Sequence, residues 1–168
     1  FNLNRREADI AIRATAKPPE YLVGRKLADI PWSMYASSHY LSGKEKSGQQ
    51  MPDEFNALSD HRLIGATGIM STLPAFQWLD KHHGEQIVAR CNDLLSMSYM
   101  AEAGHGIAFL PDDQSRKELT RLCEFSPGER SHLWLLTHHD SRQVERIKLL
   151  VSFLGNAFKQ DEQLNAHS

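Results

Sequence analysis

The sequence predicts an α/β protein in which short strands alternate with helices. Residues 62–66 and 87–91 are short apolar runs typical of buried strands. A helical pattern over 93–103 follows the second run, and a further strand pattern covers 106–111. Strand, helix and strand in short succession indicate a parallel sheet with crossover helices.

Three strands are expected near the start of the chain. Residues 8–13 alternate in polarity and end at a turn with two prolines, and a second strand covers 22–27. The third strand, over 32–37, is preceded by a proline that suits a strand entry. Residues 41–52 contain almost no apolar side chains and therefore predict a solvated loop.

Helix boundaries in the middle of the chain follow from capping residues. A proline and two acids predict a short helix over 52–58, because acidic groups favour the positive end of the helix dipole. Asn92 is placed to cap the helix over 93–103, and Gly104 lies just past its end.

The last third predicts two strands and a long helix. The strands cover 119–125 and 133–137 and are separated by a turn over 126–129. Asp140 and Gln143 fit a capping box. Apolar residues then recur at helical spacing, namely Val144, Ile147, Leu150, Val151, Leu154 and Phe158. From residue 159 this periodicity is lost, which predicts a frayed tail.

Composition excludes several classes of protein. The 168 residues carry 19 Lys and Arg against 21 Asp and Glu, a net charge of −2, and 40% are hydrophobic. No apolar run approaches the ~18 residues of a membrane span, and no broad positive field is available for nucleic acid. Two cysteines, Cys91 and Cys123, are expected to be buried, reduced thiols. We see no signal peptide, so a cytoplasmic location is expected, within a protein longer than this chain.

Seven segments, in order, resemble the effector-binding domain of LysR-type transcriptional regulators. They are EADIAIR (7–13), LVGRKL (22–27), Trp32 with YAS (35–37), HRLI (61–64), RCN (90–92), AGHGIAFLP (103–111) and LWLLT (133–137). Cys91 stands where the family usually has Val, a small apolar exchange that should not disturb the strand.

The resemblance implies a fold like the type 2 periplasmic binding proteins. Two Rossmann-like lobes are joined by two crossing strands, with a small-molecule cleft between them. Lobe I is expected over 1–31 and 126–160, lobe II over 32–125 and a tail over 161–168. Lobe I is expected to be incomplete, because family members have a further strand, helix and strand ahead of it.

The same resemblance implies the partners. The family dimerises through its effector domains, so a homodimer or tetramer is expected. DNA is bound only through a helix-turn-helix domain that these 168 residues lack. The expected function is to sense a small anionic metabolite and thereby control that domain. The alternative is a solute-binding protein or another non-catalytic binding module of the same fold.

Candidate ligand-binding residues lie at the carboxyl ends of predicted strands, where such folds bind ligands. They are Arg13, Thr15, Thr67, Asn92 and Asp93. Arg13 could pair with a carboxylate, and the helix beginning at Asn92 offers free N–H groups to an anion. We expect Asp93 to turn away from that end. The alternative is that Thr15 and Thr67 only stabilise turns and that Asn92 only caps its helix.

Catalytic and metal sites are not expected. The chain has nine histidines, but adjacent pairs such as His82 with His83 and His138 with His139 would point to opposite faces of a strand. We therefore interpret them as surface residues. No nucleophile elbow and no cluster of metal ligands occurs, so neither an enzyme nor a cofactor is predicted. The three tryptophans, Trp32, Trp78 and Trp134, are interpreted as packing residues rather than a ligand-stacking set.

Overall fold

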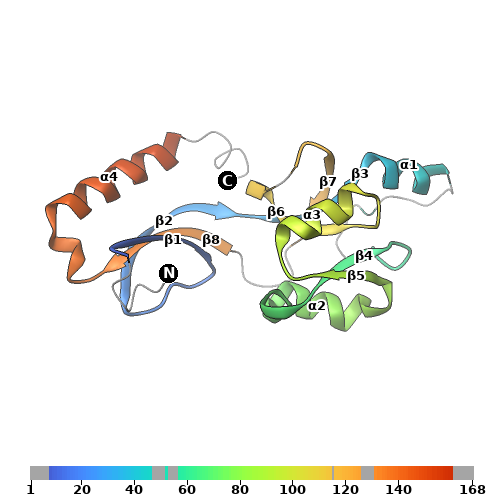
Figure 1. The fold of residues 1–168 in the computed structure, drawn as a ribbon, viewed down its shortest axis with the longest axis horizontal. Coiled ribbons are helices and arrows are strands. Elements are labelled where there is room, and N and C mark those ends of the chain that lie inside the picture. Colours follow the sequence, from blue (N-terminus) through green and yellow to red (C-terminus); the bar gives the residue numbers. More distant parts are fainter. Residues whose placement is uncertain (1–7, 47–51, 53–56, 115, 126–130, 161–168) are drawn as a thin grey trace. The chain divides into compact units, whose positions relative to one another are not determined.

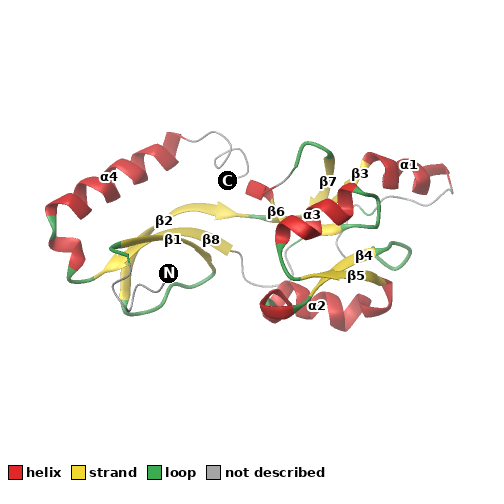
Figure 2. Cartoon of the chain, viewed as in Figure 1, coloured by secondary structure: helices red, strands yellow, loops and turns green. Residues whose placement is uncertain are grey.

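The computed structural model describes residues 8–46, 52, 57–114, 116–125 and 131–160, and these divide into two units. One unit takes in residues 1–30 and 130–168, the other residues 31–129, in each case as far as they are described. Each unit combines strands and helices (Figures 1 and 2). None of the helices in the described part of the chain is long and apolar enough to cross a membrane.

The first unit is built on a three-stranded antiparallel sheet. Its strands are β1 (Ile10–Thr15), β8 (Ser131–His138) and β2 (Leu22–Ile30), with β8 in the centre. Helix α4 (Glu145–Gln160) contacts β2 and buries Ile147 and Gly155. The buried apolar cluster of this unit is small, consisting of Leu22 and Leu136 with a few partly buried neighbours.

The second unit contains an antiparallel and a parallel sheet. Strand β3 (Trp32–Ser37) lies between β6 (Ala108–Pro111) and β7 (Leu119–Glu124), and both pairs are antiparallel. Strands β4 (Leu63–Ala66) and β5 (Ile87–Cys91) are parallel, and a parallel bridge joins Leu63 to Ile107, just ahead of β6. The predicted parallel sheet is confirmed here, but the remaining strand pairs are antiparallel.

The helices of the second unit are α1 (Ser38–Lys46), α2 (Pro74–His83) and α3 (Leu94–Glu102). This unit has the larger hydrophobic core, in which three phenylalanine rings are in contact. The ring centroid of Phe109 lies 4.3 Å from that of Phe125 and 6.5 Å from that of Phe76. Trp32 contacts Phe76, and Trp78 contacts Phe125, each with centroids 6.0 Å apart. The interpretation of these two tryptophans as packing residues is confirmed.

Helix α1 contradicts the predicted loop over 41–52, of which residues 47–51 lie outside the described residues. The Ser37 hydroxyl accepts a hydrogen bond from the backbone N–H of Tyr40 at 3.3 Å. The Tyr40 ring is buried, and its hydroxyl accepts the backbone N–H of Arg62 at 3.0 Å. This cap and the tertiary contacts of Tyr40, together with a hydrogen bond from the Lys44 ammonium to the Asp60 carbonyl at 2.6 Å, hold a helix whose composition is otherwise polar.

The start of α4 also differs from the prediction. A short 3₁₀ turn, η5 (Ser141–Gln143), precedes the helix, and the Asp140 side chain makes no capping hydrogen bond. Val144 has extended backbone angles that separate this turn from Glu145, so the capping box is wrong. Lys159 and Gln160 belong to α4 rather than to a tail. The predicted turn over 126–129, the tail from 161 and most of the predicted helix over 52–58 lie outside the described residues.

Candidate functional site

The carboxyl ends of β4 and β5 lie side by side in the second unit. Ala66 pairs with Cys91, and the backbone N–H of Thr67 donates to the Cys91 carbonyl at 2.8 Å. Thr67 and Asn92 therefore leave the same edge of the sheet together, and both are exposed. Among the residues that the structure describes, neither the Thr67 hydroxyl nor the Asn92 amide has a hydrogen-bond partner. This edge thus presents two polar groups to solvent.

The backbone conformation at this edge favours a glycine. Gly68 has a φ of +61°, a region that L residues with side chains rarely adopt. A Cβ built on Gly68 would lie 3.9 Å from the Cβ of Asn92. Thr67 and Gly68 lead into a 3₁₀ turn, η2 (Gly68–Thr72), whose Ile69 is 88% exposed. Ile69 was not among the predicted site residues. Its place directly after the glycine of a turn could have indicated an exposed apolar side chain at this edge.

Asp93, and not Asn92, caps α3. The Asp93 carboxylate accepts the backbone N–H of Ser96 at 2.8 Å and the Ser96 hydroxyl at 2.7 Å. These hydrogen bonds, the backbone one above all, hold the pKa of Asp93 below its ordinary value. The predictions that Asn92 caps the helix and that Asp93 turns away are therefore wrong. A carboxylate already occupies the helix end that was expected to attract an anion.

Arg90 is a further residue of this edge that sequence reasoning missed. Its guanidinium donates to the Ala66 carbonyl at 3.1 Å and forms an ion pair with Asp80 of α2 at 2.8 Å. Arg90 thereby ties the end of β4 to α2. Its position in a strand directly before the Cys91-Asn92 pair was the available signal.

Arg13 and Thr15 both lie on β1 of the first unit. Arg13 pairs with Trp134 and Thr15 with His132 across the antiparallel ladder, so the predicted turn at residues 14 and 15 is instead the end of the strand. The Thr15 hydroxyl donates to the Lys17 carbonyl at 3.0 Å, and the Thr15 carbonyl accepts the indole N–H of Trp134 at 3.2 Å. The Thr15 hydroxyl thus stabilises a turn in this structure, which agrees with the alternative interpretation of this residue.

One of the paired histidines contradicts the surface interpretation. His82 and His83 lie on α2 rather than on a strand, and His83 is buried on the same face as Phe76 and Leu79. Burial, and then the neighbouring His82, lower the pKa of His83. His82 is exposed and stacks on Trp78 with ring centroids 4.7 Å apart. The described residues contain no group of three or more potential metal ligands.

Both cysteines are free thiols, but they differ in burial. Cys91 is buried at the end of β5, and burial raises the pKa of its thiol. Cys123 on β7 is only partly buried. The expectation of two buried thiols is therefore right for Cys91 and wrong for Cys123, which lies on an outer strand of its sheet.

This α/β architecture, with two units that each contain a sheet, is a periplasmic-binding-protein-like fold. The family model of the LysR substrate binding domain matches residues 2–159. The chain belongs to this family. No match is found among curated protein sequences.

Solved structures show the same fold. The regulatory domain of CrgA, a LysR-type regulator from Neisseria meningitidis, superposes with a TM-score of 0.69 at 19% identity, over 94% of this chain and 79% of that chain. The Synechocystis PCC6803 CcmR regulatory domain in complex with 2-PG gives 0.64 at 22% identity, over 94% and 77%. Full-length AphB, a virulence activator of Vibrio cholerae, gives 0.62 at 19% identity, over 91% of this chain and 53% of that chain.

Proposed function

We propose that this chain is the effector-sensing domain of a LysR-type transcriptional regulator. In this proposal a small metabolite binds at the edge formed by Thr67 and Asn92, in the cleft that the family resemblance implies. The observation that supports it most directly is the adjacency of two exposed polar side chains without partners among the described residues, at the carboxyl ends of parallel strands. Binding would control a helix-turn-helix domain of the same protein in the cytoplasm.

The capping of α3 changes what we propose about the charge of the effector. An anion placed at the start of α3 would meet the carboxylate of Asp93 instead of open N–H groups. The negative charge of an anionic effector is therefore assigned to Arg13, with Thr15 as its neighbour two residues further along β1. Thr67 and Asn92 are assigned to hydroxyl, carbonyl or amide groups of the same molecule.

A thermal-shift screen of small metabolites followed by calorimetry tests this proposal. Thr67→Val and Asn92→Ala should each weaken binding of a hit roughly fivefold or more, because each removes a hydrogen bond worth about 1 kcal/mol. Thr120→Val is the matched control, since Thr120 is an exposed threonine on β7. Unchanged affinity in both site variants would reject this edge as the binding site. A loss in Arg13→Gln confined to anionic hits would support the assigned charge.

The alternative is a solute-binding protein or other non-catalytic module of the same fold. The family assignment favours the regulator, because domains of this family belong to transcriptional regulators. The sequence upstream of Phe1 decides between them, since a helix-turn-helix supports the regulator and a secretion signal supports the solute-binding protein. By itself this chain, with its net charge of −2, should give no sequence-dependent gel shift with operator DNA at physiological salt.

We also propose that the chain self-associates as a homodimer or tetramer. Helix α4 carries apolar side chains that are unusually exposed, with Leu149 at 64% and Phe153 at 68%. They lie one turn apart and so form one continuous apolar surface. Sedimentation of the chain and of Phe153→Ser checks this proposal. A wild-type chain that sediments as a monomer at high concentration would contradict it.

A further inference from the structure

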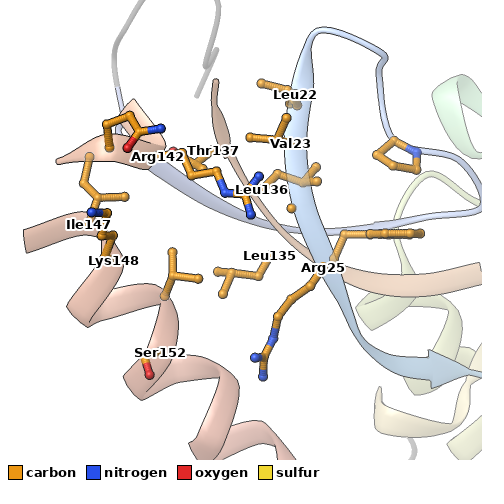
Figure 3. Close-up of a pocket in the computed structure, with 15 residues that line it drawn as sticks. Leu22, Val23, Arg25, Leu135, Leu136, Thr137, Arg142, Ile147, Lys148 and Ser152 are labelled. Carbon is orange, nitrogen blue, oxygen red and sulfur yellow. The ribbon is translucent and has the colours of Figure 1, made fainter. Parts of the chain in front are cut away.

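A pocket of about 900 Å³ lies wholly within the first unit (Figure 3). It opens between strands β2 and β8 on one side and helix α4 on the other. Its apolar walls are formed by Leu22, Val23, Leu135, Leu136, Ile147 and Val151. The volume lies within the range of small-molecule sites, which is roughly 300–1,000 Å³.

The charged side chains around this pocket are all basic. Arg25, Arg142 and Lys148 line it, and none of the described acidic side chains does. Lys148 forms an ion pair with Glu145, one turn earlier on α4, at 3.6 Å. Within the described part of the chain, Arg25 and Arg142 have no carboxylate at ion-pair distance. The pocket therefore combines an apolar interior with an excess of positive charge.

The guanidinium of Arg25 lies against α4 at Gly155. Figure 3 shows the Arg25 side chain extending from β2 toward that helix. A Cβ added to Gly155 would clash with the Arg25 guanidinium, so the guanidinium lies directly on the bare backbone of the helix. Glycine is unfavourable inside a helix, and its presence at this buried position is what admits the guanidinium.

We propose that this pocket binds an amphipathic carboxylate, with the carboxylate on Arg25 and the apolar body between β8 and α4. An arginine beside apolar walls provides both halves of the recognition, since guanidinium pairs with carboxylate and the walls remove the apolar body from water. Arg142 and Lys148 add positive potential at the rim. None of the residues proposed above to bind the effector, Arg13, Thr15, Thr67 and Asn92, lines this pocket, so the two proposals concern different side chains.

Calorimetry of the 168-residue chain with octanoate tests the proposal. We expect saturable 1:1 binding of octanoate, and at least about tenfold weaker binding of 1-octanol, which lacks the charge, and of acetate, which lacks the apolar body. Arg25→Gln should weaken octanoate binding about tenfold or more. Gly155→Ala should do the same by displacing the guanidinium while leaving every charge in place.

Two variants serve as controls. Arg146→Gln removes an exposed arginine of α4 that pairs with Asp9 and does not line the pocket, and Thr67→Val alters only the proposed effector edge. Both should bind octanoate within about twofold of the wild type. No saturable binding, equal binding of octanol, or unchanged binding by a folded Gly155→Ala chain would overturn the proposal. A loss confined to Thr67→Val would overturn it as well, and would place octanoate at the effector edge instead.

Discussion

The Asp93 carboxylate closes the first turn of α3 by accepting both the backbone N–H of Ser96, at 2.8 Å, and its side-chain hydroxyl, at 2.7 Å. The ionised carboxylate is the form that makes these hydrogen bonds, which is why the pKa of Asp93 lies below its ordinary value. The folded chain therefore binds this proton less readily than the unfolded chain does. The stabilising contribution is present at pH values above the unfolded pKa and is lost as the pH falls through the folded pKa.

Two substitutions of Asp93 distinguish the effect of its capping hydrogen bonds from the effect of its negative charge. Asp93→Ala should lower the free energy of unfolding near neutral pH, because Ser96 loses its acceptor. Asp93→Asn should retain most of the stability near neutral pH, since asparagine caps about as well as aspartate. Because asparagine has no carboxylate to protonate, its capping contribution to the free energy of unfolding should not be lost at low pH. Urea unfolding of the three chains at about pH 7 and about pH 3 measures both effects. Equal stability of wild type and Asp93→Ala at the higher pH would contradict the capping role.

Several elements could be predicted because their signals are local. The strands over 32–37 and 87–91 have the predicted bounds, and Gly104 ends α3 with a φ of +80°, as its position after the helix predicted. The position of the α3 cap was missed by one residue. Asn92 and Asp93 are both good caps, and only the backbone path out of β5 decides between them.

Other features depend on contacts that the sequence does not display. Tyr40, the buried residue that anchors α1, accepts a hydrogen bond from the backbone N–H of Arg62, which lies 22 positions away along the chain. The pocket of the first unit requires Arg25 and Gly155 to meet across a strand and a helix. Likewise, His83 is buried because α2 turns that side toward the core with Phe76 and Leu79. Tertiary packing sets all three, and neither periodicity nor composition reveals it.

The end of α3 provides a matched pair of glycine substitutions. The Gly104 N–H donates to the Ala101 carbonyl at 2.9 Å, and a Cβ on Gly104 would lie 3.2 Å from the His39 ring. Gly104→Ala should therefore cost roughly 1–2 kcal/mol, because an L side chain strains the left-handed backbone. Gly84 follows α2 with a φ of −57° and open space around it. Gly84→Ala should be neutral or stabilising by up to about 1 kcal/mol. Urea unfolding compares the two, and equal effects would contradict the assigned strain.

His83 should make the folded chain sensitive to mild acid. Burial lowers its pKa in the folded chain, so the unfolded chain takes up the proton first as the pH falls. Stability should thus decline as the pH drops from above the ordinary value of 6.5 toward the lowered folded pKa. His83→Gln should flatten this part of the profile, while His139→Gln, at an exposed position, should leave it unchanged. Unfolding measured between about pH 8 and about pH 5 checks this, and identical profiles for wild type and His83→Gln would refute it.

The two units should differ in local stability. The buried cluster of the first unit consists of Leu22 and Leu136, whereas the cluster of the second unit includes the three packed phenylalanines of its core and many aliphatic neighbours. In the described part of the chain, β1 also pairs with a strand on one side only. Native-state hydrogen exchange should therefore show earlier loss of protection in β1 and β2 than in β5 and β6, because opening the first unit exposes less apolar surface.

A pair of leucine truncations extends this comparison to the cores themselves. Leu136→Ala should cost about 2–5 kcal/mol in the first unit, enough to abolish protection in β1 and β2 while leaving that of β5 and β6 in place. Leu110→Ala, at an equally buried position of β6, should lower the free energy of unfolding by a similar amount. Its effect should instead be a loss of hydrogen-exchange protection at the backbone amides of the second unit. Loss of protection throughout the chain in both variants would mean that the two units unfold as one. In that case the small cluster around Leu136 would contribute as much to the free energy of unfolding as the large cluster of the second unit. That result would contradict the expectation drawn from the smaller number of side chains that the small cluster buries.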